Sequence, residues 1–350
     1  MLKEKRLIML SVIKLRSESE EIELNELFQE CLDWAWITGQ LYRHRLEGYF
    51  ISYISETQRS ILIFKVRQSL ELMLKVNEII NKEQLQITEI LFHEIQNQGI
   101  NVAGLKGVVF NTSIYSLSVR RSNDIDLLVN EKDMQIMDDI MEKHNFIQSI
   151  DYGETKATRK DKLVQIMNYH DLVPYYKKID NQLIDKIKID INIHFDEKEN
   201  DITDDILSHN IMKYEKNGYC VNGLTWRLHL CHLMVRFFRE VSGDIWIREF
   251  RDIELYKLVD IENTVRTLKE RDLVEWVESI KKYHLSKHVF VTLYYLNKLY
   301  PKKIYELMMD KLQKEVEIVH TEGKIIVEGH ELLEKNNFFN KAFNMIYRAE

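Results

Sequence analysis

Residues 104–130 read GLKGVVFNTSIYSLSVRRSNDIDLLVN, and they determine the fold that we expect. The stretch opens on a turn at Lys106-Gly107, continues with helical character, and closes on Asp124-Ile125-Asp126 followed by Leu-Leu-Val. Alternation of polar and apolar residues that becomes wholly apolar predicts a strand entering a buried sheet. Because side chains repeat every two residues along a strand, Asp124 and Asp126 are predicted to share one face.

The residue types around this strand are those of a site for phosphoryl chemistry. Two carboxylates on one face repel each other unless a cation lies between them, and Mg²⁺ is held by one or two carboxylates plus substrate phosphates. A glycine turn such as Gly107 that leads into a helix offers backbone N–H groups to a phosphate. Lys106 adds a cation, and Arg120 and Arg121 are candidates to bind further phosphate oxygens. An isolated Asp-x-Asp also occurs at solvated strand ends, but its combination with a glycine turn is more specific.

The segment resembles the signature of the polymerase-beta-like nucleotidyltransferase superfamily, in which a glycine turn is paired with Asp-x-Asp and a later acidic strand. Within that superfamily, LKG…RRSNDIDLLV is similar to a largely uncharacterised bacterial nucleotidyltransferase family. The resemblance includes residues 189–195, IDINIHF, as the later strand, and it covers roughly residues 85–260. It implies an α+β fold, with a small mixed-sheet core between helical N- and C-terminal parts.

The later strand departs from the family pattern at one position. Residues 186–195 alternate isoleucines with a second set, which comprises Lys186, Lys188, Asp190, Asn192 and His194. Relatives place an acidic residue two before the histidine, where this chain has Asn192. Asp190 lies on the same face roughly 6.5 Å away. A buried strand has little reason to carry an aspartate among isoleucines unless it binds something. If the site tolerates the shift, Asp190 is therefore the expected third metal ligand with general-base character, and Asn192 and His194 lie beside it. The alternative is an ion pair between Asp190 and Lys186 or Lys188.

Outside this core the pattern is mainly helical. We expect a helical N-terminal region over residues 1–98, the α/β core over 99–200, and a helical C-terminal region over 201–350, with a short strand at 323–327. Residues 163–169 are expected to form another strand. On the helix expected at 224–240, His229 and His232 share a face but lack further ligands at recognisable spacing, which argues against zinc.

Composition narrows the class of protein. The chain has 350 residues, a net charge of −7 and 3 cysteines. Duplex nucleic-acid binding depends on many Lys and Arg contacts, so this acidic balance argues against an extended nucleic-acid footprint. The sparse cysteines indicate a reducing cytoplasm, and no stretch is apolar enough to predict a membrane span. The oligomeric state is not predicted.

The function expected from these residues and the resemblance is Mg²⁺-dependent transfer of a nucleoside monophosphate from an NTP, with Mn²⁺ as an alternative metal. The acceptor is expected to be a small molecule or a peptide, and pyrophosphate is released. Asp124, Asp126 and Asp190 are the expected catalytic and metal-binding residues, and Lys106, Gly107, Arg120 and Arg121 bind the nucleotide. Two alternatives remain open: a toxin-like enzyme that modifies tRNA or a protein, and a catalytically weak nucleotide-binding module.

Overall fold

The computed structural model describes residues 3–169, 172–196, 202–249, 251–321 and 324–343. The chain divides into two compact units. One unit combines Met1–Glu71 with Leu230–Glu350, and the other is the continuous segment Leu72–His229. None of the helices in the described ranges is both long and apolar enough to cross a membrane.

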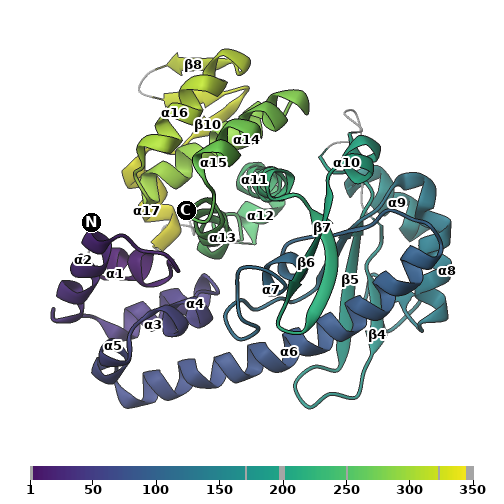
Figure 1. Ribbon diagram of the computed structural model, residues 1–350, viewed down its shortest axis with the longest axis horizontal. Helices are drawn as coiled ribbons and strands as arrows, with labels where there is room; N and C mark the ends of the chain where they lie inside the picture. Colours follow the sequence, from purple (N-terminus) through teal and green to yellow (C-terminus); the bar gives the residue numbers. More distant parts are fainter. Residues whose placement is uncertain (1–2, 170–171, 197–201, 250, 322–323, 344–350) are drawn as a thin grey trace. The chain divides into compact units, whose positions relative to one another are not determined.

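The continuous unit is built on a seven-stranded mixed sheet in the order β3-β4-β5-β2-β1-β7-β6 (Figure 1). Its strands are β1 (Ala103–Gly104), β2 (Ile125–Leu128), β3 (Ile147–Gln148), β4 (Tyr175–Lys178), β5 (Lys186–Asn192), β6 (Ile211–Lys216) and β7 (Tyr219–Leu224). The β2–β5 and β1–β7 pairs are parallel, and the other pairs are antiparallel. This mixed sheet with its helices confirms the predicted α+β class.

Helices cover the apolar face of this sheet. The C-terminal part of α6 (Phe64–Asn97), α7 (Gly107–Asn111), α8 (Met134–Lys143) and α9 (Arg159–Tyr169) contribute apolar residues to this face. The unit also contains η1 (Glu131–Asp133) and α10 (Thr203–His209). The alternating isoleucines of β5 join apolar residues of β2, α6 and α8 in one buried cluster. The period-2 pattern of β5 therefore buries one face, and its polar residues are left for the other.

Two segments of this unit differ from the sequence expectations. Residues 163–169, expected as a strand, belong to α9, because Thr158 and Asp161 cap its first turn: the Asp161 carboxylate accepts from the Thr158 N–H at 2.8 Å. This is the pattern of a capping box. Residues 211–224, expected as helix, form the β6–β7 hairpin. Its turn is Asn217-Gly218, and both residues have positive φ, the geometry that an Asn-Gly hairpin favours.

The other unit is mostly helical. Its elements are α1 (Lys3–Ser11), α2 (Glu18–Phe28), α3 (Trp34–Arg43), α4 (Glu47–Tyr53), α5 (Glu56–Ile61), the C-terminal part of α11 (Trp226–Ser242), α12 (Asp244–Arg248), α13 (Leu255–Val265), α14 (Glu270–Lys282), α15 (Ser286–Leu299), α16 (Lys303–Leu312), η2 (Gln313–Glu315) and α17 (Lys335–Phe343). A small antiparallel sheet of β8 (Ile318–Thr321), β9 (Lys324–Val327) and β10 (His330–Leu332) completes it. The strand predicted at 323–327 is found as β9, and Gly323 lies outside the described residues.

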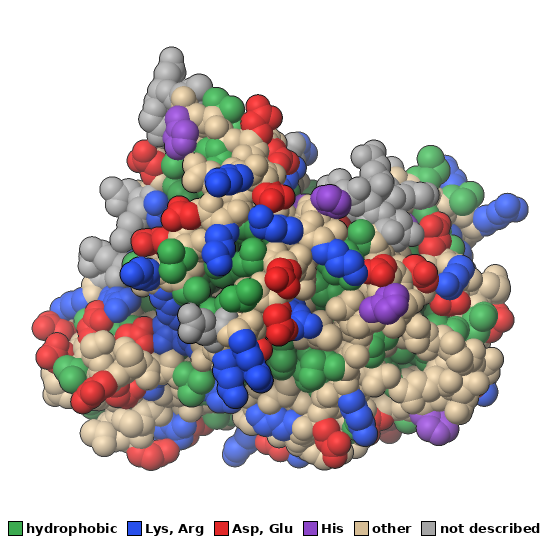
Figure 2. All heavy atoms as spheres, turned by 45° about the horizontal axis from the view of Figure 1, so that its top comes forward, with side chains coloured by type: hydrophobic (Ala, Val, Ile, Leu, Met, Phe, Trp, Pro, Cys, Tyr) green, Lys and Arg blue, Asp and Glu red, His purple; other side chains and the backbone are tan. Residues whose placement is uncertain are grey.

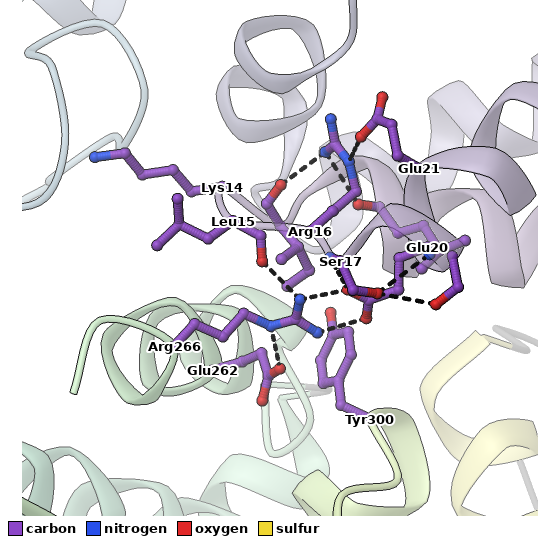
Figure 3. A network of polar contacts seen from close by, with 12 residues as sticks. Lys14, Leu15, Arg16, Ser17, Glu20, Glu21, Glu262, Arg266 and Tyr300 are labelled. Atoms are coloured by element: carbon purple, nitrogen blue, oxygen red, sulfur yellow. Dashed lines mark hydrogen bonds and ion pairs between the residues drawn. The ribbon is translucent and has the colours of Figure 1, made fainter. Parts of the chain in front are cut away.

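Charged side chains join the two sequence-distant parts of this helical unit. Figure 3 shows Arg266, which follows α13, between Glu20 and Glu262. Its guanidinium donates to both carboxylate oxygens of Glu20 at 2.6 and 2.7 Å and to Glu262 at 2.6 Å. The Glu20 carboxylate also accepts from the Ser17 N–H at 2.8 Å, which caps α2. The carboxylate of Glu20 therefore caps the N-terminus of α2 and also binds Arg266, which lies 246 residues later in the chain.

This pairing predicts a pH dependence of stability. Burial opposes ionisation of Glu20, but the hydrogen bonds and charge of Arg266, with the bond from Ser17, prevail and lower its pKa from 4.5 to about 2. A lowered native pKa stabilises the fold above the unfolded pKa and loses that effect as pH falls toward the folded value. Glu20→Gln should therefore reduce the free energy of unfolding by up to about 3 kcal/mol at pH 7, and progressively less from pH 4.5 downward.

Denaturant unfolding at pH 7, 5, 4 and 3 checks this prediction. Glu18→Gln, an exposed residue in the first turn of the same helix, is the matched control. A difference between wild type and Glu20→Gln that stays constant across this range would contradict the assignment.

Candidate active site

The predicted glycine turn joins β1 to α7 and carries strong local constraints. Lys106 adopts φ +46°, an uncommon conformation for a residue with a side chain. Its backbone N–H donates to Nε2 of His229 at 3.0 Å. Burial, followed by the charges of Arg120 and Lys106, lowers the pKa of His229 to about 3, so the ring is neutral and can accept this bond. His229, considered above only as a zinc ligand, instead supports the turn.

Gly107 is required at this turn by close packing. A Cβ atom at this position would lie 1.7 Å from Oγ of Ser122 and 3.1 Å from Nη1 of Arg120. No side chain fits into that space unless Ser122 moves. Glycine therefore brings the turn directly against the segment that leads into Asp124.

The two predicted arginines occupy different environments. Arg120 is 5% exposed, donates to Oγ of Ser122 at 3.0 Å, and lies over the ring of Phe110 at 5.3 Å. These contacts make Arg120 part of the packing beneath the turn. Arg121 is exposed. Of the two, Arg121 is the one whose side chain is accessible to a ligand in solution.

The three predicted aspartates come together because β2 and β5 are adjacent and parallel. Asp126 is the register partner of Asp190, so the two side chains lie side by side on neighbouring strands about 4.8 Å apart. Asp124 precedes β2 and shares their face. The sequence predicted that Asp124 and Asp126 share a face, and the pairing of β2 with β5, whose register partners are 64 residues apart, adds Asp190.

Two lysine ammonium groups bind these carboxylates. Nζ of Lys106 lies 2.6 Å from Oδ1 of Asp126, whose side chain is 5% exposed. Nζ of Lys188 lies 2.6 Å from Oδ2 of Asp190 and 3.6 Å from Oδ2 of Asp124. The ion pair between Asp190 and Lys188, considered above as an alternative to a metal role, is therefore present.

Burial and close charges shift the pKa values of Asp190 and Lys188. Burial raises the pKa of Asp190 to about 7, the charge of Asp124 adds to the rise, and Lys188 opposes it. Burial disfavours the charge on Lys188, but Asp190 and Asp124 prevail and raise its pKa above the usual value. Asp190 thus ionises reluctantly and Lys188 remains an ammonium group.

Asn192, expected beside the metal, is the last residue of β5, and His194 follows the strand. The amide of Asn192 donates to the carbonyl of Leu127 at 3.1 Å, which ties β5 to β2 just beyond the paired aspartates. Nε2 of His194 lies 3.8 Å from a carboxylate oxygen of Glu131 in η1. Asn192 therefore helps to fix the strands that carry the carboxylates.

The oxygen donors of this cluster suit a hard divalent cation. Within the described ranges, no group of three or more His, Cys, Asp or Glu side chains is arranged to hold a metal ion. The carboxylates of Asp124, Asp126 and Asp190 are engaged by ammonium groups, which compete for the same oxygen atoms. The ligand types fit Mg²⁺ or Mn²⁺, but the lysines must move before an ion can bind.

Comparisons with known proteins bear on what this cluster does. No curated protein matches the chain. One solved structure that it resembles is an antigenic nucleotidyltransferase-like protein from Paracoccidioides brasiliensis, at 10% identity and a TM-score of 0.28, over 55% of this chain and 92% of that one. That likeness is too weak to support an argument. Residues 30–301, however, match the model of an uncharacterised nucleotidyltransferase family. This match includes the glycine turn and all three aspartates, and the chain belongs to that family of nucleotidyltransferases.

Proposed function

We propose that this chain is a metal-dependent nucleotidyltransferase that moves an NMP from an NTP to a hydroxyl or phosphate group of a small molecule or peptide. The observation that carries the proposal is the register of β2 and β5, which brings Asp126 beside Asp190 on the face of Asp124. Family membership supports nucleotidyl transfer as the reaction class. The polymerase-beta-like ancestry, a bacterial origin and a cytoplasmic location remain predictions.

Each residue near the turn has a distinct part in the proposed reaction. Asp124, Asp126 and Asp190 would hold Mg²⁺ or Mn²⁺, which when bound supplies charge neutralisation of the triphosphate and activation of the acceptor oxygen. Lys106 would bind the phosphates from its position in the turn. Arg121, whose side chain is exposed, would bind further phosphate oxygens. Arg120 would act through packing, because it is buried against Phe110 and Ser122.

The proton released in the reaction has a candidate acceptor. As the acceptor oxygen forms its bond to the α-phosphorus, the bond to the β-phosphate oxygen breaks and pyrophosphate leaves. The acceptor hydroxyl then loses its proton. Asp190 is the candidate for this role, because its carboxylate lies beside Asp126 on the neighbouring strand.

One observation favours a second candidate. Both Lys106 and Lys188 bind the carboxylates that a metal needs, as expected of a module that binds nucleotide with little turnover.

The surface charge does not favour a tRNA acceptor. Figure 2 shows acidic and basic side chains interspersed over one face of the molecule, and the chain has a net charge of −7. Neither observation indicates the basic surface that tRNA binding requires.

We predict that Asp126→Asn lowers NTP-dependent transfer about 10³-fold or more, because a neutral amide is a poor metal ligand. The assay supplies Mg²⁺ or Mn²⁺ and each α-labelled NTP, and measures pyrophosphate release and label on small molecules, peptides, tRNA or protein. Asp139→Asn, an exposed aspartate on α8, is the control and should retain full activity.

The outcomes separate the candidates. Release of pyrophosphate with label on a small acceptor supports the proposal, and label on tRNA or protein supports a toxin-like enzyme. NTP binding without pyrophosphate release supports the weak module. Wild-type activity in Asp126→Asn would overturn the proposed site.

Gly107 gives a separate prediction, because its packing and its proposed approach to phosphate can be distinguished. Gly107→Ala should lower the melting temperature by several degrees, since the new Cβ collides with Ser122. Removing the Ser122 side chain as well, in Gly107→Ala/Ser122→Gly, should restore part of that loss. NTP affinity should stay at least tenfold below wild type in the double variant, because the added methyl group still blocks backbone approach to phosphate.

Thermal unfolding and calorimetric titration with a non-hydrolysable NTP measure the two effects, with Ser122→Gly alone as control. Unchanged melting in Gly107→Ala would contradict the packing, and wild-type affinity in the double variant would place the nucleotide elsewhere.

A further inference from the structure

The position of Lys188 raises a question about how a metal reaches the carboxylates. Lys188 lies on β5 two residues before Asp190, so both side chains leave the same face of one strand. Its ammonium group contacts Asp190 at 2.6 Å and lies 3.6 Å from Asp124. Its ammonium group therefore lies between the carboxylate of Asp190 on β5 and that of Asp124, which precedes β2.

An ammonium group at this position competes with a metal in two ways. It uses the oxygen of Asp190 that an ion would coordinate, and its charge repels any cation that approaches Asp124. Its side chain is 31% exposed, so the site is partly shielded from solvent and the repulsion is less screened than at the surface. Lys106 holds Asp126 in the same manner at 2.6 Å. The carboxylates are thus largely neutralised without any ion from solution.

A triphosphate reverses this competition. Its oxygens are strong acceptors for ammonium groups, and a lysine side chain with four methylene groups can change partners without backbone movement. When Lys188 binds phosphate, its former carboxylate oxygens become available, and the incoming nucleotide brings a metal ion with it. The same lysine then opposes the metal before nucleotide binding and supports the metal–nucleotide complex afterwards.

We propose that Lys188 is a positioning residue that keeps divalent metal off Asp124 and Asp190 until an NTP binds, and that it then moves to the triphosphate. The inference rests on the proposed function for the identity of the ligand. Its consequence is that stable metal binding requires nucleotide. Free NTP would bind without waiting for a metal-filled site, and free metal would bind weakly.

The test measures two affinities in the same variants, with Mn²⁺ as the probe. The first titration uses Mn²⁺ alone, and the second uses the complex of Mn²⁺ with a non-hydrolysable ATP analogue. Lys188→Gln should bind Mn²⁺ alone at least tenfold more tightly than wild type, and should bind the Mn²⁺–nucleotide complex at least fivefold more weakly. A residue with only a structural role would not change the two affinities in opposite directions.

Matched variants complete the experiment. Lys186→Gln removes a lysine from the same strand and face that pairs with Glu154 instead, and it should match wild type in both titrations. Lys188→Arg keeps the charge and should still exclude Mn²⁺ alone. Two affinities that fall together in Lys188→Gln, or an unchanged affinity for Mn²⁺ alone, would overturn the proposal.

Wild type provides a further check that does not depend on the folding of Lys188→Gln. If wild type without nucleotide binds Mn²⁺ in the low micromolar range, and Asp124→Asn abolishes that binding, Lys188 does not exclude metal. These titrations require no turnover. A lack of transfer activity would refute the proposed function, but the Mn²⁺ titrations would still show whether Lys188 excludes metal.

Discussion

The arrangement of the sheet depends on how three carboxylates on one face are neutralised. Asp126 and Asp190 are register partners on parallel strands, and Asp124 lies beside them, so their mutual repulsion opposes the pairing that the buried isoleucines favour. Lys106 and Lys188 supply the opposing charge from within the protein. The two faces of β5 are thus coupled. Burial of the isoleucines holds the aspartates close together, and the lysines reduce the repulsion between their carboxylates.

Local patterns were sufficient to predict much of this arrangement. The alternation in β5 and the Asp-x-Asp at β2 predicted two strands, the shared face and the need for a cation between the carboxylates. The pairing of Asp190 with Lys188 was one of the stated alternatives, but the contact of the same lysine with Asp124 was not predicted, because it depends on which strand lies next to β2. Lys188 approaches Asp124 only through a parallel pairing that joins residues more than 60 positions apart. The predictions for α9 and for the β6–β7 hairpin were wrong, although the sequence contains a local signal for each. Thr158 and Asp161 form a helix cap before α9, and Asn217-Gly218 is a hairpin turn.

Several residues selected for chemistry also have supporting roles. Gly107 leaves room for the Ser122 side chain, Arg120 is packed on Phe110, and His229 accepts a hydrogen bond from the strained backbone of Lys106. Such contacts keep the turn rigid against the aspartates, which is what accurate placement of a phosphate requires. The sequence could not distinguish a buried arginine from an exposed one here, because Arg120 and Arg121 are adjacent and chemically identical.

The most direct test of this account is a crystal structure with Mn²⁺ and a non-hydrolysable NTP, in which anomalous scattering locates the metal. The account predicts a Mn²⁺ ion about 2.1 Å from carboxylate oxygens of Asp124, Asp126 and Asp190. It also predicts that the ammonium groups of Lys106 and Lys188 have moved from the aspartates to the phosphates. A metal–nucleotide complex bound elsewhere, with Lys188 still on Asp190, would contradict it.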